Sequence, residues 1–294
     1  MSKITRALEK AARERLQARQ DAVTAPSAPV TVPIVTPVIP AAPYLEPRIG
    51  AIAPAGAVEI DPHIVTANDS TSPIAEQYRI LRTNLKSVYG RSGSKVILIT
   101  SAVNGEGKSV TSINLALTFA RQEHCRVVLV DADMRKSSVP RWLGLKDRHR
   151  GLSSVLQQGG ELNGSLVSLQ SPRLAILPAG PVADQPAELL ESVAMKRLLA
   201  TLKTQFDLVI IDAPPVLPVT DPGVLASQAD GVLLVVRAGK TQRKTVLEAQ
   251  EQLKKARANM LGCVLTHVEY YLPGYQRYYR YYRASQANGG PDTN

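Results

Sequence analysis

Short apolar runs alternate with stretches of helical period from about residue 66 onward. The six runs cover residues 96–100, 127–130, 174–177, 208–211, 232–236 and 261–265. Because the runs are continuous and rich in β-branched side chains, we expect strands that are buried on both faces. Their alternation with helices predicts an α/β fold with a mostly parallel sheet and helices on both faces. Folds of this kind bind ligands at the carboxyl ends of their strands.

The segments outside this region have different patterns. Residues 1–22 carry apolar side chains at i, i+4 spacing among Lys and Arg, which predicts a basic amphipathic helix. It is either a solvated, frayed helix or a docking element for a partner or an anionic membrane surface. Eight prolines fall within residues 24–54, so residues 23–65 are expected to form an extended linker. The folded domain is predicted over residues 66–268, followed by a flexible tail over residues 269–294.

A glycine-rich loop follows the first apolar run and precedes a helical pattern. Residues 101–109 read SAVNGEGKS, which matches Walker A spacing with Ala102 in place of the usual first glycine. Backbone N–H groups of such a loop and the N-terminus of the next helix favour phosphate. We expect Lys108 to reach the outer phosphates and the Ser109 hydroxyl to ligate Mg²⁺. The predicted nucleotide-binding residues are Asn104, Gly105, Glu106, Gly107, Lys108, Ser109, Val110 and Arg135.

Carboxylates follow two more of the apolar runs. Asp131 and Asp133 come after the run at 127–130, and Asp212 comes after the run at 208–211. Mg²⁺ prefers oxygen ligands, and a further carboxylate can accept the proton of an attacking hydroxyl. A single aspartate at a strand end is commonly a cap or turn residue. Three of them after a phosphate loop favour a phosphoryl-transfer site.

The composition adds an unusual tyrosine cluster. Aromatic residues make up only 4% of the 294 residues, yet most of the ten tyrosines lie in one short tail. The cluster consists of Tyr270, Tyr271, Tyr275, Tyr278, Tyr279, Tyr281 and Tyr282. Such a tail could pack on the domain, bind nucleic acid by stacking with Arg between the rings, or be the substrate of the phosphoryl-transfer site.

Net charge, hydropathy and the cysteines indicate the kind of partner and the cellular location of the protein. The net charge of +10 suits anionic partners such as nucleotides, nucleic acid or acidic lipid. No apolar run approaches the ~18 residues of a membrane-spanning helix, and the first residues lack the apolar core of a signal peptide. We therefore expect a soluble cytoplasmic protein, for which a place beside a membrane stays open. Cys125 and Cys263 lie in apolar runs and are expected to be buried thiols.

Together these motifs resemble those of the bacterial tyrosine kinases, P-loop autokinases of capsule and exopolysaccharide biosynthesis. The phosphate loop, the element at 131–135 (DADMR) and the element at 212–215 (DAPP) look like the Walker A, A′ and B motifs of that family. The match spans roughly residues 70–282. The resemblance implies a P-loop NTPase fold, ATP and Mg²⁺ as cofactors, and autophosphorylation of the C-terminal tyrosines in trans within a ring-shaped homo-oligomer.

The resemblance also implies roles for individual residues. Lys108 would hold the phosphates, and Mg²⁺ would be held by Ser109, Asp133 and, through water, Asp212. Asp131 would accept the tyrosine proton, while Asp133 would also organise Lys108. Arg135 would support the site. These four residues, Lys108, Asp131, Asp133 and Asp212, are the predicted catalytic set.

Partners follow from the same resemblance. Glu76, Arg79 and Arg82 fall on one face of a predicted helix, which alone indicates a solvated charged stripe with a local ion pair. In the family, a helix of this E-x-x-R-x-x-R pattern joins neighbouring subunits. A separate transmembrane chain-length regulator and a phosphotyrosine phosphatase are further implied partners, and no nucleic acid is expected.

A rival interpretation keeps the same phosphate site without kinase activity. The chain would then be a P-loop ATPase whose nucleotide controls assembly with a polysaccharide export complex. Partitioning ATPases carry a signature lysine five residues before the phosphate-loop lysine, where this chain has Val103. Together with the tyrosine cluster, that residue favours the kinase.

Overall fold

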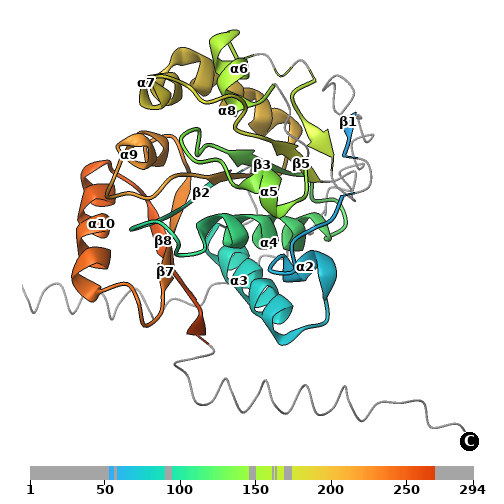
Figure 1. Cartoon of the computed structure of the whole chain (residues 1–294), viewed down its shortest axis with the longest axis vertical. Coiled ribbons are helices and arrows are strands. Elements are labelled where there is room, and N and C mark those ends of the chain that lie inside the picture. The colour runs from blue at the N-terminus through green and yellow to red at the C-terminus, as the bar shows by residue number, and fades with distance from the viewer. Residues whose placement is uncertain are drawn as a thin grey trace, which may run out of the picture. The chain divides into compact units, whose positions relative to one another are not determined.

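The computed structural model describes residues 53–55, 58–89, 95–145, 150–160, 162, 164–168 and 174–268 (Figure 1). The helix predicted over residues 1–22, most of the predicted linker and the tyrosine tail lie outside these residues. They stay predictions. None of the helices in the described part has the length and apolar composition needed to cross a bilayer.

The centre of the described part is one eight-stranded sheet in the order β1-β4-β5-β3-β6-β2-β7-β8. The strands are β1 (Ala53–Pro54), β2 (Lys95–Ser101), β3 (Val127–Asp131), β4 (Val167–Ser168), β5 (Leu174–Leu177), β6 (Leu208–Asp212), β7 (Gly231–Arg237) and β8 (Met260–Thr266). Neighbouring strands are parallel except for the antiparallel pair β4 and β5. The mostly parallel sheet expected from the apolar runs is confirmed.

Helices cover both faces of this sheet, as predicted (Figure 1). They are α2 (Val65–Asn68), α3 (Pro73–Tyr89), α4 (Lys108–Ala120), α5 (Val139–Trp142), α6 (Leu152–Gln157), α7 (Pro186–Glu191), α8 (Val193–Gln205), α9 (Asp221–Ala226) and α10 (Arg243–Lys255). Alternate side chains of β2 show why its run is continuously apolar. Val96 and Leu98 pack with α6 to α10, whereas Ile97 and Ile99 pack with α2 to α5.

The folded domain includes residues upstream of the boundary expected at residue 66. β1 pairs with β4, and Ile60 and Ile64 are buried against the face of the sheet that α4 covers. The Asn114 side chain of α4 accepts a hydrogen bond from Thr66 N (3.0 Å) and ties this segment down. Prolines dominate the local pattern, but Pro54 lies in an edge strand, where a missing N–H is tolerated. The packing therefore extends the domain into the predicted linker.

The expectation of burial was wrong for β8. This strand lies at the edge of the sheet beside β7, and Leu265 is 58% exposed. Cys263 on β8 is exposed and Cys125 is half-buried, so the prediction of two buried thiols was also wrong. A continuous apolar run has the same composition whether its strand is central or at an edge.

The strand order brings three of the predicted motifs to one edge. β6 lies between β2 and β3, with Asp212 in register with Ile99 on one side and with Asp131 on the other. Because these strands are parallel, the loop after β2 and the aspartates after β3 and β6 meet at the same carboxyl edge.

Candidate functional site

The phosphate loop connects β2 to α4 and depends on two glycines in a left-handed conformation. Gly105 has φ +79° and Gly107, which precedes α4, has φ +92°. Other residues rarely adopt these angles without strain. No side chain caps the N-terminus of α4, so its first N–H groups are available to an anion.

Glu106 fastens this loop to the neighbouring strands. Its carboxylate is buried and accepts hydrogen bonds from Val103 N (2.8 Å), Arg237 N (3.3 Å) and the Thr241 hydroxyl. The hydroxyl of Thr266, the last residue of β8, donates to the Glu106 carbonyl oxygen at 2.8 Å. The carboxylate of Glu106, a predicted nucleotide-binding residue, therefore forms hydrogen bonds within the protein and stabilises the conformation of the phosphate loop.

Glu106→Gln is expected to weaken Mg·ATP binding about tenfold. The amide nitrogen of glutamine replaces one carboxylate oxygen and cannot accept a hydrogen bond, so one of the two backbone N–H groups loses its acceptor. Calorimetric titration with Mg·ATP measures the change. Glu248→Gln on the exposed face of α10 removes the same charge and should leave the dissociation constant unchanged. Equal affinity in wild type and Glu106→Gln would refute this role for Glu106.

Lys108 is the cation at the centre of the site. Its Nζ lies 2.9 Å from Asp133 Oδ2 and 3.6 Å from Asp212 Oδ2. Burial alone would lower the pKa of Lys108, but the charges of Asp212 and Asp133 outweigh it and raise the pKa above its usual value. The ammonium group is therefore charged and already flanked by carboxylates.

Asp212 holds two hydroxyls of α4. Its Oδ2 accepts from Ser109 Oγ at 2.5 Å, and its Oδ1 accepts from Ser112 Oγ at 3.2 Å. The carboxyl group is completely buried, and this burial raises its pKa against the opposing effects of Lys108 and Ser109. Ser138 donates to Ser109 Oγ at 2.9 Å, which further fixes that hydroxyl.

Asp131 is buried beside Asp212 and is held by the turn that follows β3. Oδ1 accepts from Asp133 N (3.1 Å), while Oδ2 accepts from Ser137 Oγ (2.7 Å) and Val139 N (3.3 Å). Burial, with a further contribution from the Asp212 charge, raises the pKa of Asp131 to about 7. A carboxyl group that titrates near neutrality is suited to accept a proton.

The Arg135 guanidinium pairs with a carboxylate at the start of α9. Its Nε and Nη2 donate to the two carboxylate oxygens of Asp221 at 2.7 and 3.0 Å. Asp221 is buried at the first turn of α9. This pair links the turn after β3 to the segment after β6 and so stabilises the positions of Asp131 and Asp212.

Several site residues were missed by sequence reasoning. Ser112, Ser137 and Ser138 are contacts of the catalytic aspartates or of Ser109. A serine among other small residues has no sequence pattern that would identify it as a site residue. Asp221 starts a helix, where an acidic residue is common for dipole reasons, so its partner Arg135 could not be recognised from spacing.

The remaining predicted residues lie in three places. Asn104 is exposed in the phosphate loop, and Val110 is half-buried in α4. Glu76 and Arg79 of α3 form an ion pair, while Arg82 Nη1 donates to Thr118 O of α4 at 3.0 Å. The seven tail tyrosines lie outside the described residues.

The oxygen atoms around Lys108 fit a nucleotide-bound Mg²⁺. Within the described residues, no group of three or more His, Cys, Asp or Glu is arranged to hold a metal by itself. Ser109, Asp133 and Asp212 offer a hydroxyl and carboxylates, which are hard ligands of the kind that Mg²⁺ prefers. Phosphate oxygens and water commonly complete such a coordination shell, so the donor set suits Mg·ATP.

Several known proteins are similar to this chain in sequence and in fold. A family model described as an AAA domain matches residues 94–261, which contain the phosphate loop and all three aspartates. Tyrosine-protein kinase YwqD of Bacillus subtilis is 37% identical over 203 residues, covering 69% of this chain and 85% of YwqD. The chimerical protein CapA2B2 is 32% identical with a TM-score of 0.65, covering 73% of this chain and 93% of the chimera. The kinase domain of Escherichia coli tyrosine kinase ETK is 30% identical with a TM-score of 0.65, covering 69% and 78% of the two chains.

Proposed function

The chain belongs to the bacterial tyrosine-protein kinases, and we propose that it transfers the terminal phosphoryl group of Mg·ATP to tyrosines of its own C-terminal tail. The observation that carries this proposal is the convergence of Lys108, Ser109 and three aspartates at the carboxyl ends of β2, β3 and β6. Phosphoryl transfer to a hydroxyl requires such a cation, metal ligands and a proton acceptor.

The residues divide the chemistry between them. Lys108 and the amides of residues 105–109 hold the phosphates and neutralise the charge that develops on the transferred group. Mg²⁺, when bound, supplies further neutralisation of the phosphate oxygens. Asp131 accepts the proton of the tyrosine hydroxyl as its oxygen forms a bond to the terminal phosphorus. The bond from that phosphorus to the bridging oxygen breaks, and ADP leaves.

The anchoring of β8 supports the tail as the substrate. Thr266 contacts the phosphate loop through the Glu106 carbonyl, and the tail begins at residue 269. The last described strand, which precedes the tail in the sequence, therefore ends beside a phosphate loop. Phosphorylation of all seven would add about −10 to −14 charges to a chain of net charge +10. Tails modified in this way would repel one another and leave the sites of neighbouring subunits.

Incubation of the purified chain with Mg·ATP is expected to produce a ladder of phosphate additions confined to the tyrosines of residues 270–282. Phosphosite mapping by mass spectrometry measures it, and a chain with these tyrosines changed to phenylalanine is the matched control. For transfer in trans, a Lys108→Met chain should be phosphorylated when it is mixed with an active chain that ends at residue 268. A single mass that ATP leaves unchanged would favour the nucleotide-controlled assembly ATPase instead.

Family membership also supports a set of partners. We infer that Glu76, Arg79 and Arg82 of α3 contribute to a ring-shaped homo-oligomer. A separate transmembrane chain-length regulator of capsule or exopolysaccharide would bring the kinase to the inner face of the membrane. The basic segment at residues 1–22 is the docking element proposed for that partner, and a phosphotyrosine phosphatase would reset the tail.

A further inference from the structure

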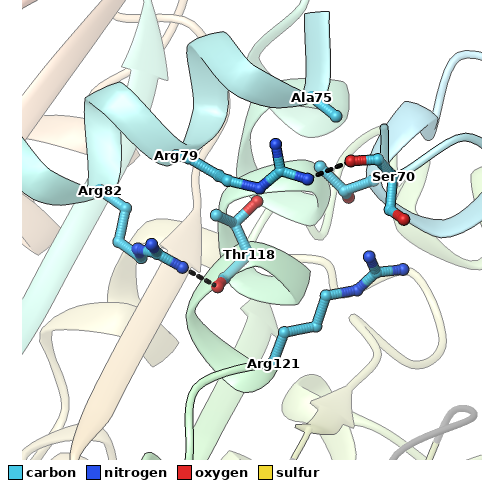
Figure 2. Close-up of a pocket in the computed structure, with 7 residues that line it drawn as sticks. Ser70, Ala75, Arg79, Arg82, Thr118 and Arg121 are labelled. Atoms are coloured by element: carbon cyan, nitrogen blue, oxygen red, sulfur yellow. Dashed lines mark hydrogen bonds between the residues drawn. The ribbon is translucent and has the colours of Figure 1, made fainter. Parts of the chain in front are cut away.

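Three arginine side chains surround one small pocket that the catalytic mechanism does not use. The pocket has a volume of about 50 Å³ and lies between α3 and α4 (Figure 2). Arg79, Arg82 and Arg121 line it, with Thr66, Ser70 and Thr118 among the remaining lining residues. A single water needs only roughly 10–15 Å³ of such space, so the pocket has room for a group of several heavy atoms.

The packing of α3 on α4 assembles this pocket from separate parts of the chain. Arg79 and Arg82 are one helical turn apart on α3 and so point from the same face. Arg121 directly follows α4. In Figure 2 the side chains of Arg79 and Arg82 reach toward Ser70 and Thr118, and Arg121 lies across from them.

The hydrogen bonds within the pocket leave donors unused. Arg79 donates to Glu76 and to the Ser70 carbonyl, and Arg82 Nη1 donates to the Thr118 carbonyl. Arg82 Nε is buried and has no acceptor within the described residues. Among those residues, none accepts a hydrogen bond from the Arg121 guanidinium. An unpaired buried donor costs about 1–3 kcal/mol, which an incoming acceptor would remove.

The charges around the pocket are also unbalanced. Three guanidinium groups face a single carboxylate, that of Glu76, within ion-pair distance in the described part of the chain. Two positive charges are therefore in excess. Carboxylates carry one negative charge, whereas a phosphate group carries about −1.5 to −2 near neutral pH. Guanidinium forks also match phosphate oxygens in geometry.

We propose that Arg79, Arg82 and Arg121 form a binding site for one phosphate group, separate from the phosphate loop. The group can come from inorganic phosphate or from a phosphotyrosine. The second source rests on the proposed function, because there the kinase itself makes the ligand. Since Arg79 and Arg82 also belong to the predicted subunit interface, a phosphate bound here would lie at that boundary.

Calorimetric titration tests the site in the full-length chain whose seven tail tyrosines are changed to phenylalanine, because that tail cannot accept phosphate and the phosphate loop stays intact. Excess Mg·ADP fills the phosphate loop, and ionic strength is held constant. Inorganic phosphate and O-phospho-L-tyrosine are titrated in separate arms. Saturable binding of one equivalent in either arm is expected, and the tighter arm identifies the source. The inorganic phosphate arm requires no kinase activity, so it can succeed even if tail phosphorylation fails.

Two variants and a matched control make the test specific. Arg82→Gln and Arg121→Gln should each weaken binding at least about tenfold, the loss expected for one charged hydrogen bond. Arg121 is exposed, so its variant should fold even if Arg82→Gln does not. Arg197→Gln on the exposed face of α8 makes the same charge change and should bind as before.

Two results would overturn the proposal. One is equal weakening by Arg121→Gln and Arg197→Gln, which would indicate general electrostatic attraction. The other is no saturable binding of either phosphate source. If the oligomer mass in light scattering then fell in Arg121→Gln alone, the pocket would instead bind an acidic side chain of a second copy.

Discussion

Lys108→Met is expected to reduce phosphoryl transfer to the tail tyrosines at least about 10²–10³-fold, the effect of removing one preorganised charge from such a site. Methionine has nearly the same length but no ammonium group. It therefore cannot neutralise the phosphates or contact Asp133 (2.9 Å) and Asp212 (3.6 Å). Initial rates of phosphotyrosine formation with an unphosphorylated acceptor chain measure the effect.

The same variant should lose stability in a pH-dependent way. Without Lys108, the buried carboxyl groups around it lose their cation, so the folded state binds protons more tightly than the unfolded state. The destabilisation should therefore be larger at pH 8 than at pH 6. Lys203→Met is the matched control, because that lysine forms a partly exposed pair with Asp230 at the opposite end of β2 from the phosphate loop. This variant should leave the rate unchanged. Near-normal transfer by Lys108→Met would rule out the assigned site.

Asp131→Asn is expected to lower the rate of transfer about 10²–10⁴-fold, the range for loss of a general base. The asparagine oxygen can still accept from Asp133 N, as the aspartate does at 3.1 Å, so the turn should persist. The amide nitrogen can donate to the Ser137 hydroxyl in place of accepting from it, and only Val139 N (3.3 Å) loses its acceptor. The variant thus removes the proton acceptor while preserving most contacts. Unchanged KM for ATP alongside the lost rate would be the signature of this role.

The stability of Asp131→Asn provides a second, independent measurement. In the nucleotide-free protein the pKa of Asp131 is raised from 3.8 to about 7, so between these pH values the folded state holds a proton that the unfolded state has released. The wild type therefore loses stability as pH rises through this window, and the variant does not share that loss. The free energy of unfolding of the variant minus that of the wild type should therefore increase by roughly 2–4 kcal/mol from pH 4 to pH 7.

Denaturant unfolding at several pH values measures this shift without any catalysis. Asp207→Asn is the control, because this substitution also removes one negative charge. Asp207 pairs with Arg126 at the exposed start of β6. A parallel pH dependence in wild type and Asp131→Asn would show that Asp131 ionises normally.

The elements that position the site could be predicted from the sequence because their signals are local. Continuous apolar runs indicated the central strands, and the spacing of residues 101–109 indicated the phosphate loop. An aspartate directly after a run indicated a carboxylate at a strand end. Each inference needs only neighbouring residues, whose period and type follow from local backbone geometry.

Local signals failed where burial depends on distant partners. Leu265 and Cys263 are exposed because β8 lies at the edge of the sheet. The composition of the apolar run at 261–265 does not indicate the position of its strand in the sheet. Ile60 and Ile64 belong to the core because α4 lies over them, although the prolines around them indicated a linker. Packing thus overrode the local pattern in both directions.

The sequence by itself determined the parts of this kinase: a phosphate loop, three aspartates at strand ends and a tyrosine-rich tail. Only the tertiary structure decided how the parts meet. Insertion of β6 between β2 and β3 brings Asp212 to Ser109, and the packing of α3 on α4 brings Arg121 to Arg82. The physical reason is that contacts between residues far apart in the chain depend on strand order and helix packing. No local preference of the backbone encodes them.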